Sequence, residues 1–217
     1  MPETMLQLRT LVTPEATLEV SLEEAPLPVP GDDQVLVRIE AAPINPSDLG
    51  LLFGLADITT AEFSGTEARP RITASVPEGG MRQMAGRVGQ SLEVGNEGSG
   101  TVVAAGSDPA AQALIGRVVG LAGGGTYAHY RVAPASQVLP MDDGVDAAAA
   151  ASCFVNPMTA LGMVETMKRD GHRGLVHTAA ASNLGQMLNR ICLADGIPLV
   201  NVVRRPEQEQ LLRDQGA

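Results

Sequence analysis

The sequence is poor in residue types on which several classes of protein depend. Its 217 residues include two cysteines, three phenylalanines, two tyrosines and no tryptophan. Two cysteines are too few for a disulfide scaffold or a four-cysteine zinc site, so we interpret Cys153 and Cys192 as reduced core thiols. Aromatic residues make up only 2% of the chain, which excludes the stacking platforms that bind single-stranded nucleic acids.

Positive charge is also scarce, and long hydrophobic runs are absent. Fifteen basic and 25 acidic side chains give a net charge of -10, so we expect neither nucleic acid nor an anionic membrane surface as a partner. No run approaches the roughly 20 consecutive apolar residues of a membrane span. The first ten residues, MPETMLQLRT, lack the basic and apolar regions of a secretory signal, which predicts a cytoplasmic protein. The 44% of hydrophobic residues is typical of a globular fold.

The first 145 residues have the pattern of a β-rich domain. Glycine and proline recur about every 8 to 12 residues, with short valine-rich runs between them. The best strand candidates are residues 34–39 (QVLVRI), 100–105 (GTVVAA) and 118–122 (VVGLA). We predict a closed or partly closed barrel.

From residue 146 the pattern changes to alanine-rich helical sequence followed by an α/β unit. The expected elements are helices at 146–151 and 157–167, a strand at 174–178, a helix at 183–194, a strand at 198–203 and a helix at 206–215. Continuous apolar strands separated by a helix favour a parallel pair that is buried on both faces.

The turn between the first of these strands and its helix has the small residues of a dinucleotide-binding site. The segment AAASNLGQ (179–186) places small residues where backbone amides and a helix N-terminus can meet a pyrophosphate. Only one glycine of a G-x-G-x-x-G pattern is present, so a generic tight turn is about equally consistent with it. The candidate cofactor-binding residues here are Ala180, Ala181, Ser182, Asn183, Leu184 and Gly185.

The second strand of the unit ends in two arginines, Arg204 and Arg205. An enzyme that prefers NAD carries Asp or Glu near this point to accept from the ribose hydroxyls, whereas arginine pairs with a 2′-phosphate. The arginines therefore predict NADPH, and the alternative is that they are solvated residues that cap the next helix.

Five segments resemble the medium-chain dehydrogenases/reductases in order and approximate spacing. They are AAPINPSDLG (41–50), VGNEGSGTVVAAGSD (94–108), FVNPMTALGM (154–163), HTAAASNLGQML (177–188) and NVVRRP (201–206). The resemblance implies an α/β fold class with a β-rich domain: a GroES-like β-barrel catalytic domain at 1–145, then an incomplete Rossmann domain at 146–217. The branches that it resembles most are the zinc-free quinone oxidoreductases and the 2-enoyl thioester reductases. It also implies NADPH, a small-molecule substrate and a homodimer of the intact protein.

Two asparagines stand where zinc-dependent members of this superfamily have ligands. Asn45 takes the place of the cysteine and Asn96 that of the histidine in G-H-E-G. Amide side chains are poor zinc ligands, and the cysteine-rich lobe for structural zinc is missing, so we predict no metal. Three scattered histidines, His129, His172 and His177, are interpreted as structural.

The resemblance also suggests catalytic residues. It places Asn45, Ser47 and Asp48 on the barrel wall facing the nicotinamide, although Asn45 also suits an Asx turn before a proline and Asp48 a loop-orienting role. The tyrosine donor of the enoyl thioester reductases is replaced by Ala56.

Two further residues complete the candidate site. Tyr127, where relatives have an aromatic residue, is a candidate for the substrate pocket, although alternation along a strand would more often give it a wall role. Thr159, in the FVNPMTALGM segment, is a candidate for cofactor binding.

About forty residues separate Gly54 from Gly95, where the enoyl reductase branch has a much shorter connection. This insert, about residues 56–93, suits a lid over a cleft or passive surface packing equally. Within it, residues 78–88 predict a short helix with Met81, Met84 and Val88 on one side.

The sequence supplies only two of the six strands of a doubly wound dinucleotide fold. We therefore expect a C-terminally truncated fragment, inactive alone, of a zinc-independent NADPH-dependent oxidoreductase that reduces a polarised double bond or a quinone. The alternative hypothesis is a non-catalytic interaction module with a vestigial nucleotide-binding unit.

Overall fold

The computed structural model describes residues 1–217, which form two compact units, residues 1–152 and 153–217. The first unit contains strands β1 (Thr4–Val12), β2 (Thr17–Pro26), β3 (Gln34–Ala41), β4 (Asp57–Thr66), β5 (Arg69–Ser75), β6 (Leu92–Glu93), β7 (Glu97–Ala105), β8 (Val118–Ala122), β9 (Tyr130–Pro134) and β10 (Val138–Pro140). Its helices are α1 (Pro46–Phe53), α2 (Glu78–Gln83), η1 (Ala85–Arg87), α3 (Pro109–Gln112), η2 (Ala135–Gln137) and α4 (Ala147–Ala150). The second unit contains α5 (Val155–Arg169), β11 (Leu175–His177), α6 (Asn183–Asp195), β12 (Leu199–Asn201) and α7 (Pro206–Asp214).

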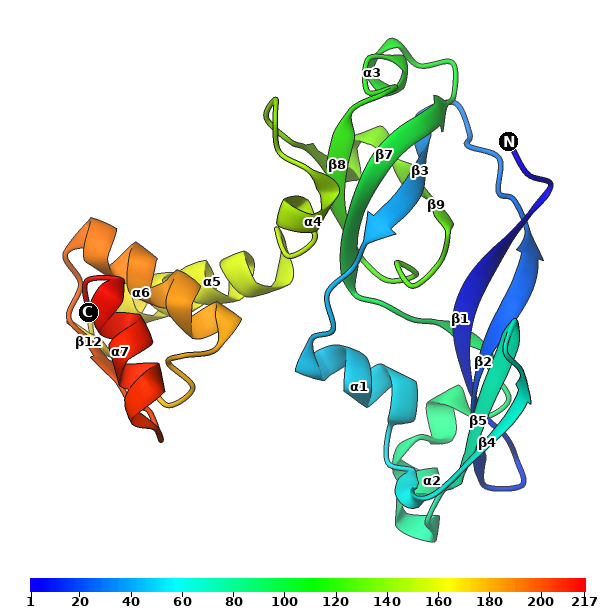
Figure 1. Ribbon diagram of the computed structural model, residues 1–217, viewed down its shortest axis with the longest axis horizontal. Helices are drawn as coiled ribbons and strands as arrows, with labels where there is room; N and C mark the ends of the chain where they lie inside the picture. Colours follow the sequence, from blue (N-terminus) through cyan, green and yellow to red (C-terminus); the bar gives the residue numbers. More distant parts are fainter. The chain divides into compact units, whose positions relative to one another are not determined.

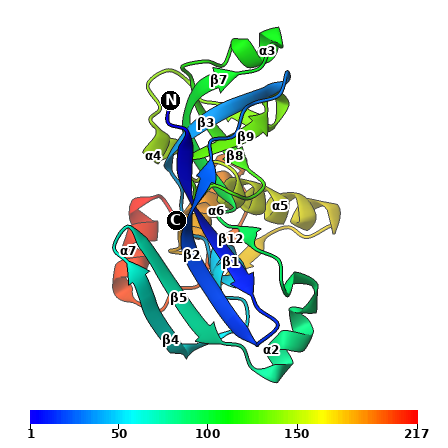
Figure 2. The same ribbon diagram turned by 90° about the vertical axis from the view of Figure 1, so that its right-hand side faces the viewer.

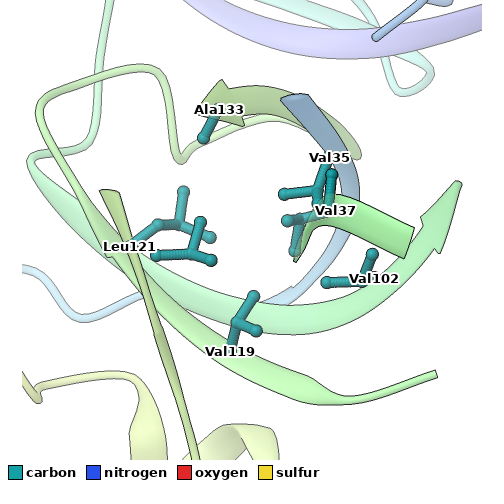
Figure 3. Packing of buried hydrophobic residues seen from close by; sticks show 8 residues of the cluster. Val35, Val37, Val102, Val119, Leu121 and Ala133 are labelled. Carbon is teal, nitrogen blue, oxygen red and sulfur yellow. The ribbon is translucent and has the colours of Figure 1, made fainter. Parts of the chain in front are cut away.

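One sheet of the first unit has the strand order β10-β8-β7-β3-β9, with antiparallel neighbours. It curls around a core whose valine and leucine side chains point toward one another, as Figure 3 shows. The buried residues of this core are Val35, Val37, Val102, Ala111, Val119, Leu121, Ala133 and Val138. The predicted strands at 34–39, 100–105 and 118–122 are confirmed, and their alternating valines line this core because side chains on a strand alternate between faces.

The other sheet of the first unit has the order β4-β5-β2-β1-β6 (Figure 2). The segment 127–129 joins the two sheets. The Leu8 amide donates to the Tyr127 carbonyl at 2.8 Å, while the His129 carbonyl accepts from the Ile39 amide of β3 at 2.9 Å. The two sheets are therefore linked by backbone hydrogen bonds, as a partly closed barrel requires.

The insert at 56–93 is built into this second sheet. Its strand β5 pairs with β2 in antiparallel register from Thr17↔Ser75 to Ser21↔Arg71. The predicted helix is present as α2 and η1, and Met81, Met84 and Val88 all pack in one hydrophobic core. Most of the insert is thus packed against the unit, and β4 forms the exposed edge of the sheet.

In the second unit, β11 and β12 form the predicted parallel pair, with Leu175 opposite Leu199. Helices α5 and α6 pack on the face that carries these leucines, through a core of Ala160, Val164, Leu188 and Cys192. The prediction that both faces would be buried is wrong. Val176 and Val200 point to the opposite face and are 68% and 59% exposed, because the helices of this unit cover only one side of the sheet.

The stretch Ala147–Arg169 is long and apolar enough to cross a membrane by length and composition alone. It is divided between α4, which packs on strands of the first unit, and α5, whose Ala160 and Val164 pack against α6. Figure 1 shows the break between the two helices. Core helices pass the same test of length and composition.

Candidate functional site

The turn between β11 and α6 brings a helix N-terminus close to the end of a strand. Ser182 is the N-cap of α6, and its hydroxyl accepts from the Gly185 amide at 3.1 Å. A Cβ at Gly185 would lie 2.3 Å from the Ala180 carbonyl oxygen and 2.6 Å from that of Ala179. The helix can therefore approach the turn this closely only because residue 185 is glycine.

A cavity of about 280 Å³ lies beside this turn. It is lined by Thr178, Ala179, Ala180, Ala181, Ser182, Val202, Val203, Arg204 and Gln208. Three of the predicted turn residues, Ala180, Ala181 and Ser182, thus line the same cavity as Arg204. About twenty residues separate them from Arg204 in the sequence. No carboxylate lines the cavity, while the α6 N-terminus and the Arg204 guanidinium both attract negative charge. This cavity suits a phosphate-bearing ligand.

The other predicted cofactor residues do not line this cavity. Asn183, Leu184 and Gly185 lie in the first turn of α6. Arg205 is the N-cap residue of α7. Thr159 lies in α5, where its hydroxyl donates to the Val155 carbonyl at 2.6 Å. Cofactor contact by these residues stays a prediction.

Gln208, which the sequence analysis missed, is part of the cavity wall. It is half-buried at the third position of α7, and its Oε1 accepts from the Arg204 amide at 3.0 Å. A glutamine at the third position of a helix can reach back to a backbone amide at its start, and this spacing was the signal that could have identified it; the bond goes to Arg204, one residue before the N-cap Arg205.

The second unit also has a larger cavity, of about 580 Å³, between α6, β12 and α7. Apolar side chains such as Leu193, Ile197 and Leu212 form most of its wall. It contains none of the predicted site residues, so its size alone does not make it the cofactor site.

The predicted catalytic residues of the first unit form a hydrogen-bonded cluster at the start of α1. Asp48 is 1% exposed. One of its carboxylate oxygens accepts from the backbone N–H of Asn45 at 2.7 Å, and the other accepts from the backbone N–H of Asn96 at 2.8 Å. The Asn96 side chain in turn donates to the Ser47 hydroxyl at 3.0 Å. Asp48 therefore joins two loops, as the loop-orienting alternative expects, and Ser47 is the exposed member of the cluster.

Glu97 is a buried carboxylate that the sequence analysis missed. It is 1% exposed, and its Oε1 accepts from the Asn45 side-chain amide at 2.9 Å. Its backbone carbonyl accepts from the Thr126 hydroxyl at 2.7 Å. The side-chain nitrogens of Asn45 and Asn96 thus act as hydrogen-bond donors at the two positions that the resemblance aligns with zinc ligands.

Tyr127 packs against the core of the insert-bearing sheet and lies in a loop before β9, so the expected strand alternation does not apply to it. Its hydroxyl donates to the Pro43 carbonyl at 2.8 Å. Burial, followed by the nearby charge of Asp48, raises the pKa of Tyr127 to about 12. The phenol therefore stays protonated near neutral pH and holds the loop that precedes Asn45.

The family model described as the alcohol dehydrogenase GroES-like domain matches residues 31–143. Among curated proteins, the mitochondrial enoyl-[acyl-carrier-protein] reductase of Caenorhabditis elegans is 32% identical over 189 residues, or 85% of this chain and 46% of the relative. The enzyme of the same name from Xenopus tropicalis is 31% identical over 87% of this chain and 47% of its own length. The chain spans about half the length of these relatives.

Solved structures show the same fold. A crystal structure from Mesorhizobium loti assigned as an NADPH:quinone reductase matches 100% of this chain and 59% of its own, with a TM-score of 0.68 and 30% identity. A mycobacterial protein crystallised with NADPH has a TM-score of 0.66 at 22% identity, over 98% of this chain and 56% of its own. The chain therefore belongs to the alcohol dehydrogenase GroES-like family of the medium-chain dehydrogenase/reductase superfamily.

Proposed function

We propose that this chain is part of a zinc-independent, NADPH-dependent oxidoreductase that reduces a polarised double bond or a quinone. The observation that carries the proposal is the cavity in which the β11–α6 turn meets Arg204 and Gln208. The residues that line it include Ser182, the N-cap of α6, and Arg204, and none of them is a carboxylate, which suits the phosphates of NADPH.

The local backbone supports a dinucleotide at this turn. The absence of a side chain at residue 185 lets α6 begin against the Ala180 carbonyl, as the glycine of a dinucleotide-binding turn does for close helix–strand packing. NADPH, when bound, supplies a hydride. Of the residues of this chain, those of the turn would hold the pyrophosphate, and Arg204 would hold the 2′-phosphate.

The donor set in the first unit supports zinc independence. Zinc binds thiolate, imidazole and carboxylate groups. Asn45 and Asn96 offer amides whose nitrogens donate to Glu97 and Ser47. An amide nitrogen has no lone pair available for a cation, because resonance delocalises it into the carbonyl, and an amide oxygen is a poorer zinc ligand than thiolate or imidazole.

The substrate class is proposed from the relatives, which are named as enoyl reductases and a quinone reductase. Reduction of such substrates places negative charge on an oxygen, which needs a hydrogen-bond donor. Ser47 is exposed and its oxygen accepts from Asn96, so its own O–H remains available to donate. Ser47 is therefore the residue of this cluster that we assign to the substrate oxygen, with Asn45 and Asp48 holding its loop.

The proposal is tested by following NADPH oxidation at 340 nm with a quinone and an enoyl thioester, in the protein that carries this chain. We expect turnover that a chelator does not reduce, and a Ser47→Ala variant with lower kcat and unchanged NADPH affinity. Equal rates with NADH and NADPH would overturn the cofactor assignment. Loss of activity with the chelator would overturn zinc independence. The absence of both turnover and nucleotide binding would favour the interaction module instead.

A further inference from the structure

Strand β4 is the outermost strand of its sheet and pairs with β5 alone (Figure 2). It contains no lysine and no proline, two residues with which proteins commonly protect an open edge. The register between β4 and β5 shifts between Asp57 and Glu62, and it is regular from Glu62 to Thr66. A short, regular stretch of β4 is therefore open to pairing with a further strand.

One face of β4 carries the end of an apolar row that crosses the sheet. Val20 on β2 lies opposite Ile72 on β5, and Ile72 lies opposite Phe63 on β4. Val20 is 5% exposed and belongs to the core of this sheet, and Ile72 packs against that core. Phe63 is 80% exposed. The apolar row thus runs from the core to the open edge and ends there in solvent.

The backbone groups of Phe63 point to this open edge. Along antiparallel strands, successive residues turn their N–H and C=O groups alternately to one side and the other. On β5 the Ser75 N–H faces β4, where it donates to the Thr60 hydroxyl at 2.8 Å. Ile72, three residues before Ser75, therefore faces away from β4. Its partner Phe63 makes no backbone hydrogen bond to it, so the Phe63 N–H and C=O are available to another strand.

The opposite face of β4 is polar and has charges of both signs. Because side chains alternate along a strand, Glu62 and Ser64 share this face, and Arg71 on β5 lies opposite Ser64. The Arg71 guanidinium pairs with Glu19 at 3.3 Å. Glu62 is exposed and takes part in none of the ion pairs of the chain. Its carboxylate is therefore available to a cation beyond the edge.

We propose that two copies of this chain associate through β4, in antiparallel register about a two-fold axis at Phe63. The apolar row then continues into the second sheet, because Phe63 lies beside Phe63 of the second copy. Glu62 lies opposite Ser64 of the second copy, and Arg71 of that copy is the next side chain on the same face. No two like charges lie directly opposite each other, so the edge is complementary to itself.

This self-complementarity is the reason for assigning a second copy rather than a different protein. A two-fold pairing uses the β4 edge of both copies, so assembly stops at the dimer. The insert, which contains β4 and β5, is then a dimerisation element. The inference does not depend on the proposed function, since it involves neither the cofactor turn nor the cluster at the start of α1.

Sedimentation velocity of the chain over a concentration series from low to high micromolar tests the proposal. The paired segment is short, so we expect a weak dimer that appears within the series, without larger species. Phe63→Lys should raise the Kd of the dimer by at least about tenfold, because two phenylalanine side chains lose their burial. Val200→Lys is the matched control, because Val200 is a 59% exposed strand residue of the second unit. It should leave the Kd unchanged.

A charge reversal tests the register. Glu62→Lys places like charges near each other at two symmetric positions, so it should raise the Kd by about threefold to thirtyfold. Glu3→Lys makes the same change in net charge at an exposed residue beside β1, which β5 and β2 separate from β4. It should not weaken the dimer. Adding Arg71→Glu to Glu62→Lys should recover most of the loss. Thermal unfolding of each variant checks that it folds.

Four results would overturn the inference. The first is a chain that stays monomeric over the whole series. The second is a dimer that Val200→Lys dissociates and Phe63→Lys does not, because its interface would then lie on the open face of β11 and β12. Species larger than a dimer would exclude the two-fold pairing. Equal weakening by Glu3→Lys and Glu62→Lys would reflect net charge alone and would exclude the register.

Discussion

Replacing Gly185 by alanine should destabilise the second unit, although alanine is the better helix former. A Cβ at this position would lie 2.3 Å from the Ala180 carbonyl oxygen and 2.6 Å from that of Ala179. Both atoms belong to the backbone and cannot rotate away as a side chain would. The turn must therefore move away from α6, or the first turn of the helix must unwind.

The expected magnitude combines two opposing effects. Forcing an extra carbon into a packed site costs about 1–3 kcal/mol, while alanine in a helix gains about 0.5–1 kcal/mol over glycine. The difference spans about 0 to 2.5 kcal/mol, and because both clashing atoms are backbone oxygens we expect a net loss in free energy of unfolding in the upper half of that range. Gly162 in α5 provides the control, because a Cβ there has no atom within 4 Å. Gly162→Ala should raise the free energy of unfolding by about 0.5–1 kcal/mol.

Urea unfolding followed by circular dichroism at 222 nm measures both variants. The signal reports on the second unit, because the long helices α5, α6 and α7 lie there. The NADPH affinity of the Gly185→Ala chain should fall as well, since the turn to which we assign the pyrophosphate moves. A Gly185→Ala chain as stable as the Gly162→Ala chain would refute the reasoning.

Three further results are expected. Asp48→Asn should lower the free energy of unfolding by about 1–3 kcal/mol, because one of two backbone amides, one buried and one part-buried, loses its acceptor. Asp57→Asn keeps the single carboxyl oxygen that is engaged at an exposed turn. It should stay within about 0.5 kcal/mol of wild type in the same urea titration. Tyr127 has a pKa raised from 10.0 to about 12, so the stability that its neutral phenol contributes is complete below pH 10 and is lost as the pH rises toward 12. Because the chain has no tryptophan, ionisation of this tyrosine should appear as a step in absorbance at 295 nm near pH 12, and Tyr127→Phe should lack that step. An unchanged titration curve in Tyr127→Phe would contradict the assignment. Dialysis against a chelator should leave the affinity for NADPH, measured by isothermal titration calorimetry, unchanged, and a loss would indicate a bound metal.

The elements of the second unit were predictable because their signals are local. Apolar runs at 174–178 and 198–203, with a helical repeat between them, give β11, α6 and β12 within a few residues. Arg204 lies three residues beyond the end of β12 at Asn201, and its contact with a phosphate stays a prediction. The open face at Val176 was not predictable, because an apolar strand has the same sequence whether or not a second layer covers it.

The candidate site of the first unit depends on long-range packing and was predicted only in part. Asn45, Ser47 and Asp48 form one short segment and were identified together. Glu97 was missed because its burial depends on Asn45, more than fifty residues earlier, and on Thr126. A glutamate between an asparagine and a glycine gives no local sign that it will be buried and hydrogen-bonded.

The central claim, that this chain carries an NADPH site at the β11–α6 turn, is tested most directly by titrating the chain with NADPH and with NADH and following nucleotide fluorescence. The account predicts that NADPH binds at least about tenfold more tightly than NADH, because the cavity offers charge-assisted hydrogen bonds to the 2′-phosphate. Equal affinity for the two nucleotides, or binding of neither, would contradict it.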